Sequence, residues 1–360
     1  MKFLAMAAAV LGLTATSAVA GSIQRASDAS LILFERGDNY LEFSVVYADA
    51  EISGVGTGPF AGTASGDIAN SFLSFSAGFK TKITDKLTFA LVGNNPVGAD
   101  VQYGVSPYFF SGSQAEITST ALTGYLRYDI TDRFHVYGGL RATNVNGNVN
   151  LVPGTPFAYT LNVRSDIGWG YVLGAAFTIE EIFMKFALTY ESKTEHDFAD
   201  NLGVPFTVEI PQAVTLHARS AVSEKMLVFG SIRWQEWSEF SVGPNDFLTN
   251  PLNTAGLPIA FGAGDYWTYE LGVARRFTKK LAVVGTYTHE PSQGALVGNL
   301  EGRNGFDSYG IGVIYSPTRQ YDITAGIRYI NLGDATTTTI GSRFADNDAY
   351  AVGLKLGYRF

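Results

Sequence analysis

The sequence predicts an all-β protein: a transmembrane antiparallel β-barrel of about 14 strands, of the kind found in bacterial outer membranes. Two observations lead to this fold class. Stretches in which apolar residues alternate with small or polar ones recur along the chain, and the connectors between them are in turn short and long. Such alternation gives each strand one face for lipid and one for the lumen. In lipid, a closed barrel is the β structure that pairs every backbone group.

The final stretch shows the alternation most plainly. Its apolar face consists of Tyr350, Val352, Leu354, Leu356, Tyr358 and Phe360. A tilted membrane strand needs about ten residues, and aromatic residues at its ends suit the two membrane interfaces. The same pattern predicts strands at 40–50, 69–80, 87–97, 115–128, 134–146, 167–178, 182–192, 210–222, 226–238, 265–277, 281–291, 305–316, 320–331 and 347–360.

The connectors predict how the barrel is oriented. Those after even-numbered strands are tight, for example 83–86, 179–181 and 317–319, whereas most of those after odd-numbered strands are much longer. Bacterial barrels have short periplasmic turns and long extracellular loops. We therefore expect both ends of the barrel chain in the periplasm and an even number of strands.

The N-terminus and the composition fit an exported membrane protein. Lys2, an apolar run at 3–13 and the small residues Ala18-Val19-Ala20 predict a signal peptide over 1–20, which leaves 40–360 for the barrel. A net charge of −8 argues against nucleic acid as a partner. With no cysteine, the 360-residue chain has no disulfide and no thiolate metal site. No linker divides it, so we expect one barrel domain. A secreted β-sandwich would not give the regular alternation of loop lengths.

The inward faces of the predicted strands carry charged residues, including Arg141 and Arg219. Charges on the lipid face would be unfavourable by several kcal/mol near the midplane, so these side chains belong in the lumen. A barrel of this size is too wide for side chains alone to fill it easily. We therefore expect a channel, a plug or a ligand path inside.

Several predicted extracellular loops are unusually apolar, notably 105–110, 151–159 and 257–261. Loops that face water should be polar unless they pack on one another or hold an apolar molecule. Two interpretations follow, a self-packed cap and a hydrophobic capture site, and they are compatible. The aromatic residues that would bind such a molecule are Tyr108, Phe109, Phe110, Phe157, Tyr159 and Phe261.

The predicted third strand is interrupted by Asn94-Asn95-Pro96. Proline has no N–H to donate to a ladder and is disfavoured inside a paired strand. Either the strand ends there and the loop begins, or the wall has a lateral opening through which an apolar solute could leave the lumen.

No arrangement of residues predicts an enzyme, a metal site or a cofactor. The four histidines are scattered, and none has a metal-ligand spacing such as HExxH. Glu195-His196-Asp197 lies in a predicted loop, where we interpret it as a solvated polar stretch. The Ser, His and Asp residues that an outer-membrane lipase would need are present but not recognisably arranged.

Several local patterns together resemble the FadL-type outer-membrane transporters of long-chain fatty acids and other hydrophobic compounds. They are 87–98 followed by Tyr103, 168–175 with 188–192, 211–214 leading to 234–238, 284–287 with Pro291, and the closing 357–360. The resemblance implies a fourteen-stranded barrel, an N-terminal plug, a ligand groove among the extracellular loops and lateral release at the strand-three kink. On this resemblance, residues 21–39 form a reduced plug.

The expected function is passive, energy-independent uptake of a hydrophobic molecule, first among them a long-chain fatty acid. A carboxylate head group needs a cation, which Arg141 or Arg219 could supply. The main alternative is a general porin for small polar solutes, and a third interpretation is a structural or adhesive barrel. Expected partners are outer-membrane lipid, lipopolysaccharide and, through the terminal Phe360, the barrel-assembly machinery.

Overall fold

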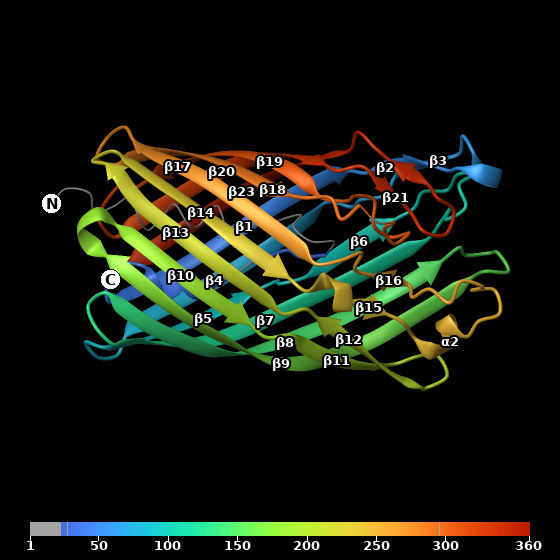
Figure 1. The fold of residues 1–360 in the computed structure, drawn as a ribbon, viewed down its shortest axis with the longest axis horizontal. Coiled ribbons are helices and arrows are strands. Elements are labelled where there is room, and N and C mark those ends of the chain that lie inside the picture. The colour runs from blue at the N-terminus through green and yellow to red at the C-terminus, as the bar shows by residue number, and fades with distance from the viewer. Residues whose placement is uncertain (1–22, 27, 295) are drawn as a thin grey trace.

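The protein is a closed antiparallel β-barrel (Figure 1). The computed structural model describes residues 23–26, 28–294 and 296–360, so the predicted signal peptide at 1–20 lies outside the described residues. The main sheet has 15 strands, and β5 and β6 together occupy one position in the wall, so the barrel is 14-stranded. β5 lies within the predicted third strand at 87–97, whereas β6 begins directly after it, where a loop was expected. The barrel closes because β5 pairs with both β4 and β7.

The wall strands follow the predicted ranges closely. They are β1 (Asn39–Glu51), β4 (Phe72–Lys82), β5 (Leu87–Asn94), β6 (Gly98–Gln102), β7 (Gln114–Asp129), β8 (Phe134–Leu151), β9 (Tyr159–Ile179), β10 (Met184–Glu191), β13 (Ala213–Ser223), β14 (Met226–Gln235), β17 (Tyr266–Arg276), β18 (Leu281–Glu290), β19 (Phe306–Tyr315), β20 (Tyr321–Leu332) and β23 (Asp348–Arg359).

Two predicted boundaries are wrong by several residues. β8 runs to Leu151 and β9 starts at Tyr159, whereas 147–166 was expected to be a loop. The outward residues of this extension are polar, with Asn146 and Asn148 opposite Thr118 and Glu116 of β7. Because this part of the hairpin has no apolar outer face, the apolar alternation that marks a membrane strand is missing although the ladder continues.

Short elements cover the end of the barrel that carries the long loops (Figure 1). They are β2 (Ser53–Val55), η3 (Gly58–Phe60), β3 (Ala64–Asp67), β11 (Thr194–Ala199), β12 (Pro205–Ile210), η5 (Trp237–Glu239), β15 (Ser241–Val242), α2 (Asn245–Leu248), β16 (Ala260–Phe261), β21 (Ala335–Thr336) and β22 (Arg343–Phe344). The C-terminus lies at the opposite end with the tight turns, one of which holds η4 (Glu180–Ile182). We call these the extracellular and periplasmic ends.

The outer face is apolar and bordered by aromatic pairs. Phe43 of β1 lies opposite Leu356 of β23, and both side chains are exposed on the outside of the wall. The rings of Tyr321 and Tyr358 stack 4.7 Å apart near the periplasmic end. Further along the same two strands, the rings of Tyr329 and Tyr350 lie 5.2 Å apart. Such girdles mark the two interfaces of a membrane barrel.

The N-terminal segment, defined here as residues 23–26 and 28–38, lies inside the barrel. Its one helical turn, η2 (Ser30–Phe34), buries Leu31, Ile32 and Leu33 against inward residues of the wall, including Tyr125 and Tyr137. The packing is close, because a Cβ atom added at Gly78 of β4 would clash with Ile32 Cδ1. The hydrophobic core of the periplasmic half is therefore made by this segment.

Polar contacts attach the N-terminal segment to opposite sides of the wall. Lys80 Nζ donates to the carbonyl of Glu35 at 2.7 Å, and Arg127 Nη1 donates to that of Leu33 at 2.5 Å. Across the lumen, Thr189 Oγ1 donates to Asp28 Oδ2 at 2.7 Å, and His217 Nε2 lies 3.3 Å from the same oxygen. These contacts leave the segment anchored to β4, β7, β10 and β13.

Candidate functional site

The wall is interrupted at the third strand. β5 pairs with both of its neighbours up to Asn94, whereas β6 pairs in the described ladder with β7 alone. The wall closes again higher up, where Asn70 N donates to the carbonyl of Asp100 at 3.2 Å. Between these points, 72–75 of β4 and 96–99 face each other without a ladder. We call this gap the wall break.

The three residues predicted to form a lateral opening lie at the periplasmic edge of the wall break. Asn94 is the last residue of β5 and still faces Ser76. The side chain of Asn95 bridges the two sides, since its Oδ1 accepts from Phe75 N at 3.1 Å and its Nδ2 donates to the Ser119 carbonyl at 2.8 Å. Pro96, which has no N–H, starts the unpaired stretch.

The N-terminal segment covers the wall break from the inside. The Arg25 amide donates to the Pro96 carbonyl at 2.9 Å, and the Gly98 amide donates to the Ile23 carbonyl at 2.8 Å. Gln24 and Val97 are therefore partners in a short antiparallel bridge. The backbone groups that β4 would satisfy in a continuous wall are satisfied here by a segment that is not part of the wall.

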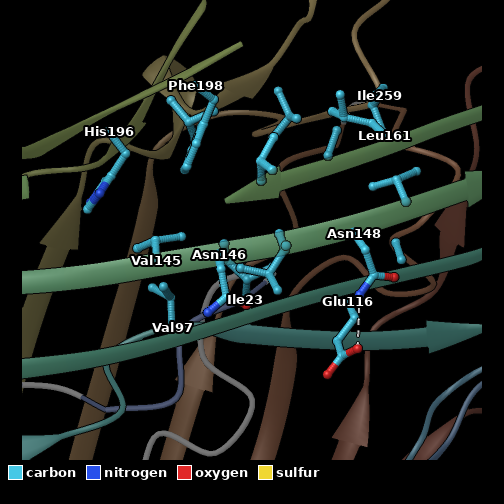
Figure 2. A pocket seen from close by; sticks show the side chains of 18 of the residues that line it. Ile23, Val97, Glu116, Val145, Asn146, Asn148, Leu161, His196, Phe198 and Ile259 are labelled. Atoms are coloured by element: carbon cyan, nitrogen blue, oxygen red, sulfur yellow. Dashed lines mark hydrogen bonds between the residues drawn. The ribbon is translucent and has the colours of Figure 1, made fainter. Parts of the chain in front are cut away.

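An apolar hollow of about 680 Å³ lies beside the wall break in the extracellular half of the lumen (Figure 2). Ile23 of the N-terminal segment and Val97 of the wall break form one side of it, close to Val145 of β8. The rest of the lining comes from β7, β8, β9, β11, β12, the loop that carries β15 and β16, and Leu300 of the loop between β18 and β19. Phe198 and Leu161 contribute to the far side. The hollow can hold an apolar molecule out of water.

The hairpin formed by β11 and β12 is an amphipathic ribbon inside the wall. Glu195 and Asp197 are exposed, whereas His196 and Phe198 are buried and line the hollow (Figure 2). The interpretation of Glu195-His196-Asp197 as solvated is thus right for the two acids and wrong for His196, because strand alternation turns it inward. The hairpin approaches β9 so closely that a Cβ atom at Gly168 would lie 2.6 Å from the Glu195 carbonyl oxygen.

Five of the six predicted ligand-binding aromatic residues form one cluster at the extracellular end. Tyr108, Phe110 and Tyr159 are buried, and Phe109 packs against Phe110 and Phe157 at ring distances of 4.9 and 6.0 Å. They pack on one another above the hollow and do not line it. Phe261 lies apart in β16, next to Ala260, which does line the hollow. The self-packed cap is therefore what the structure shows for this cluster.

A buried tyrosine stack fixes this cap. The rings of Tyr103 and Tyr108 lie 5.5 Å apart and nearly parallel, and the Tyr103 hydroxyl donates to the Asn299 carbonyl at 2.5 Å. Burial raises the pKa of both tyrosines, that of Tyr103 well above its ordinary value. Both hydroxyls therefore stay neutral.

The two predicted cations lie deeper in the lumen. Arg141 Nη2 and Arg233 Nη1 each bind an oxygen of Glu191, both at 2.5 Å. Arg219 faces Lys185 across the β10–β13 ladder nearer the periplasmic end. Neither Arg141 nor Arg219 lines the apolar hollow. The cation at the wall break is Arg25 of the N-terminal segment, whose side chain packs on Phe72 and over Gly98. No local sequence pattern marks it.

A second hollow of about 800 Å³ lies on the other side of the N-terminal segment, against the wall break. It is lined by Arg25, Phe72, Gly98 and Arg303, and Ile23 lines it as well as the apolar hollow. Ile23 and its neighbours thus lie between the apolar hollow and the second hollow, which meets the wall break.

In the part of the chain that the structure describes, no three His, Cys, Asp or Glu side chains could hold a metal ion. No helix among these residues is long and apolar enough to cross a membrane.

A closed barrel with an apolar exterior, a filled periplasmic half and an apolar hollow beside a wall break defines a class, that of outer-membrane transport barrels. A family model described as outer membrane protein transport protein (OMPP1/FadL/TodX) matches residues 5–360. The chain belongs to this family, and its location is the bacterial outer membrane. Family membership confirms the predicted resemblance, and because the family consists of transport channels, it also confirms that the chain is not an enzyme.

Solved structures share the fold at low sequence identity. A Pseudomonas aeruginosa FadL homologue is similar at a TM-score of 0.73 and 14% identity, with 98% of each chain covered. The Pseudomonas putida toluene transporter TodX is similar at 0.66 and 14%, covering 96% of this chain and 98% of that one. The Ralstonia pickettii toluene transporter TbuX is similar at 0.64 and 12%, covering 96% and 97%. No curated protein sequence is significantly similar.

Proposed function

We propose that this protein carries a hydrophobic compound passively across the outer membrane, holds it in the apolar hollow and releases it sideways through the wall break. One observation carries the proposal. The N-terminal segment at Ile23 borders the apolar hollow and also the second hollow, which meets the wall break at Phe72 and Gly98. A small movement of that segment would join them.

The periplasmic half of the barrel supports a sideways exit. The apolar cluster around η2 and its polar anchors occupy the lumen below the hollow. A solute that moved straight down would have to break these contacts and pass buried charges such as Lys185 and Glu191. An apolar molecule cannot replace the hydrogen bonds and ion pairs that it would break there, so this route is unfavourable. Lipid, by contrast, lies directly beyond the wall break.

The driving force is the removal of apolar surface from water. Burial is favourable by roughly 25 cal/mol per Å², so a lipid tail or an aromatic ring partitions into the hollow without an energy source. We propose long-chain fatty acids as the first class of solute. Two of the similar structures are of proteins named toluene transporters, so neutral hydrocarbons form the competing class.

Single-channel conductance in a planar bilayer, with and without oleate, tests the proposal. We expect a barrel that passes little current and binds oleate, because the N-terminal segment fills its lumen. A large and steady current that oleate does not change would instead identify a water-filled porin and overturn the proposal.

A further inference from the structure

The side chain of Arg25 occupies the wall break itself. Its guanidinium carbon lies 3.9 Å from the centre of the Phe72 ring, on the β4 side. On the β6 side it lies directly over Gly98, where a Cβ atom would be 2.6 Å from Arg25 Nε. Both edges of the gap thus contact one side chain, and a molecule leaving through the gap must meet this guanidinium.

The side chain of Arg25 has no hydrogen-bond acceptor in the part of the chain that the structure describes. Its Nε is buried without a partner, and no carboxylate lies within ion-pair distance of its guanidinium. A buried donor without an acceptor is unfavourable, and guanidinium groups bind carboxylates through paired hydrogen bonds. Among the described residues, the Arg25 guanidinium therefore lacks the anionic oxygen acceptor that would pair with it.

The acids closest to Arg25 are engaged elsewhere. Burial lowers the pKa of Arg25, and Asp100 and Glu116 oppose this effect through their charge. Asp100 Oδ1 accepts from Asn70 Nδ2 at 2.8 Å, and Glu116 Oε2 accepts from Asn148 Nδ2 at 3.1 Å. These acids help to keep Arg25 charged without bonding to it.

A second arginine lines the same outer hollow. Arg303 is buried, with Nη1 at 3.2 Å from Glu290 Oε1 and its Nη2 without a described hydrogen-bond partner. The inner hollow, by contrast, is lined almost entirely by apolar side chains. The outer hollow is charged rather than apolar, because Asp49, Asp100 and Glu301 line it together with the two arginines. The two spaces thus offer an apolar compartment for a tail and, past Ile23, a charged one for a head group.

We propose that Arg25 binds the carboxylate head group of the solute while the tail lies in the apolar hollow, so that this side chain makes the protein prefer a carboxylate to a neutral solute. The inference rests on the proposed function and names the residue that selects among its solutes. A phosphate of a surrounding lipid presents similar oxygens to Arg25, so the test must separate a transported carboxylate from a resident lipid.

The test is the affinity of the purified full chain, in a non-ionic detergent, for oleate and for its neutral analogue oleyl alcohol. Arg25→Gln should weaken oleate binding roughly tenfold and leave oleyl alcohol within about twofold, because only the carboxylate loses a charge-assisted pair. Arg25→Lys should restore part of the preference. Arg319→Gln, in an exposed periplasmic turn, is the matched control and should change neither affinity.

The binding results distinguish a head-group role for Arg25 from a structural role, from a resident lipid and from failure of the proposed function. Equal weakening of both ligands by Arg25→Gln would show a purely structural side chain and overturn the inference, as would no effect on oleate. Binding of lipopolysaccharide, but not oleate, in an Arg25-dependent way would assign the site to a resident lipid and also overturn it. Wild-type protein that binds oleyl alcohol but not oleate keeps the proposed function and refutes this inference, whereas protein that binds neither refutes the proposed function.

Discussion

The amide of Gly98 in β6 donates to the carbonyl of Ile23 at 2.8 Å, a bond that joins the barrel wall to a segment inside the lumen. In a continuous barrel this amide would belong to the ladder with β4. The bond therefore makes the N-terminal segment a substitute strand, and one that is held by far fewer hydrogen bonds than a wall strand. The N-terminal segment can therefore detach from the wall break while the other wall strands stay paired.

Substituting Gly98 by valine should displace Arg25, because a Cβ atom there would lie 2.6 Å from its Nε. We expect the N-terminal segment to become more accessible at the wall break. Since the chain has no cysteine, the labelling rate of a Gln24→Cys reporter measures this directly. Gly104→Val, at a position where a Cβ atom would meet nothing within 4 Å, is the control, and equal rates in the two variants would contradict the prediction.

Filling the apolar hollow should reduce ligand affinity. Val208 is buried and lines the hollow, so Val208→Trp places a large ring in the space that a ligand would occupy. We expect oleate binding to weaken roughly tenfold, about 1.4 kcal/mol, by competition for volume. Val222→Trp, at a position with 61% exposure on the outside of β13, should leave binding unchanged. Unaltered affinity in Val208→Trp would place the ligand elsewhere.

Removing the Asn95 side chain should loosen the periplasmic edge of the wall break. Asn95→Ala leaves the Phe75 amide and the Ser119 carbonyl without their bridge. The loss of one such hydrogen bond is unfavourable by about 1 kcal/mol. Hydrogen exchange at Phe75 should therefore accelerate about fivefold while exchange along β1 and β23 stays the same. Faster exchange throughout the barrel would indicate a general folding defect instead.

The attachment of the N-terminal segment should weaken in acid. Burial raises the pKa of Asp28, but hydrogen bonds and charge from His217, with Ser30 and Thr189, outweigh it and lower the pKa below its ordinary value. A lowered folded-state pKa stabilises the fold above the ordinary value near 3.9, and this contribution is lost as pH falls towards the folded-state value. Hydrogen exchange in 28–38 should be constant from pH 7 to 5, after correction for intrinsic rates, and protection should fall below about pH 4. Asp28→Asn should remove this acid dependence.

Much of the fold is predictable from the sequence because lipid imposes a simple period. The alternation that ends in Tyr358 and Phe360 gives both the length of β23 and its outward face. The same rule fails where lipid is absent. The alternation of His196 and Phe198 is equally regular, but its partner surface is the inside of β9 rather than a membrane, so no outward apolar set reveals it.

The site is less predictable because it depends on contacts between distant parts of the chain. Ile23 and Val97 border one hollow although 74 residues separate them (97 − 23). Arg25 reaches the wall break only because Pro96 ends the ladder and Gly98 leaves room for it. The interruption at Pro96 was visible in the sequence, but nothing local indicates which segment covers it. Burial of Tyr108 and Phe110 in a cap likewise depends on Tyr159 at the start of β9.

The most direct test of lateral release is a reversible lock between Gln24 and Val97. The hydrogen bonds on either side make them a non-hydrogen-bonded antiparallel pair, whose Cα atoms lie about 4.5 Å apart, within disulfide range. In this cysteine-free chain, Gln24→Cys with Val97→Cys should form one disulfide that holds the segment across the wall break. Ala48→Cys with Ala351→Cys, register partners in the continuous wall, is the control. We expect oxidation to stop oleate uptake only in the first variant and reduction to restore it, whereas uptake by the oxidised first variant would contradict lateral release.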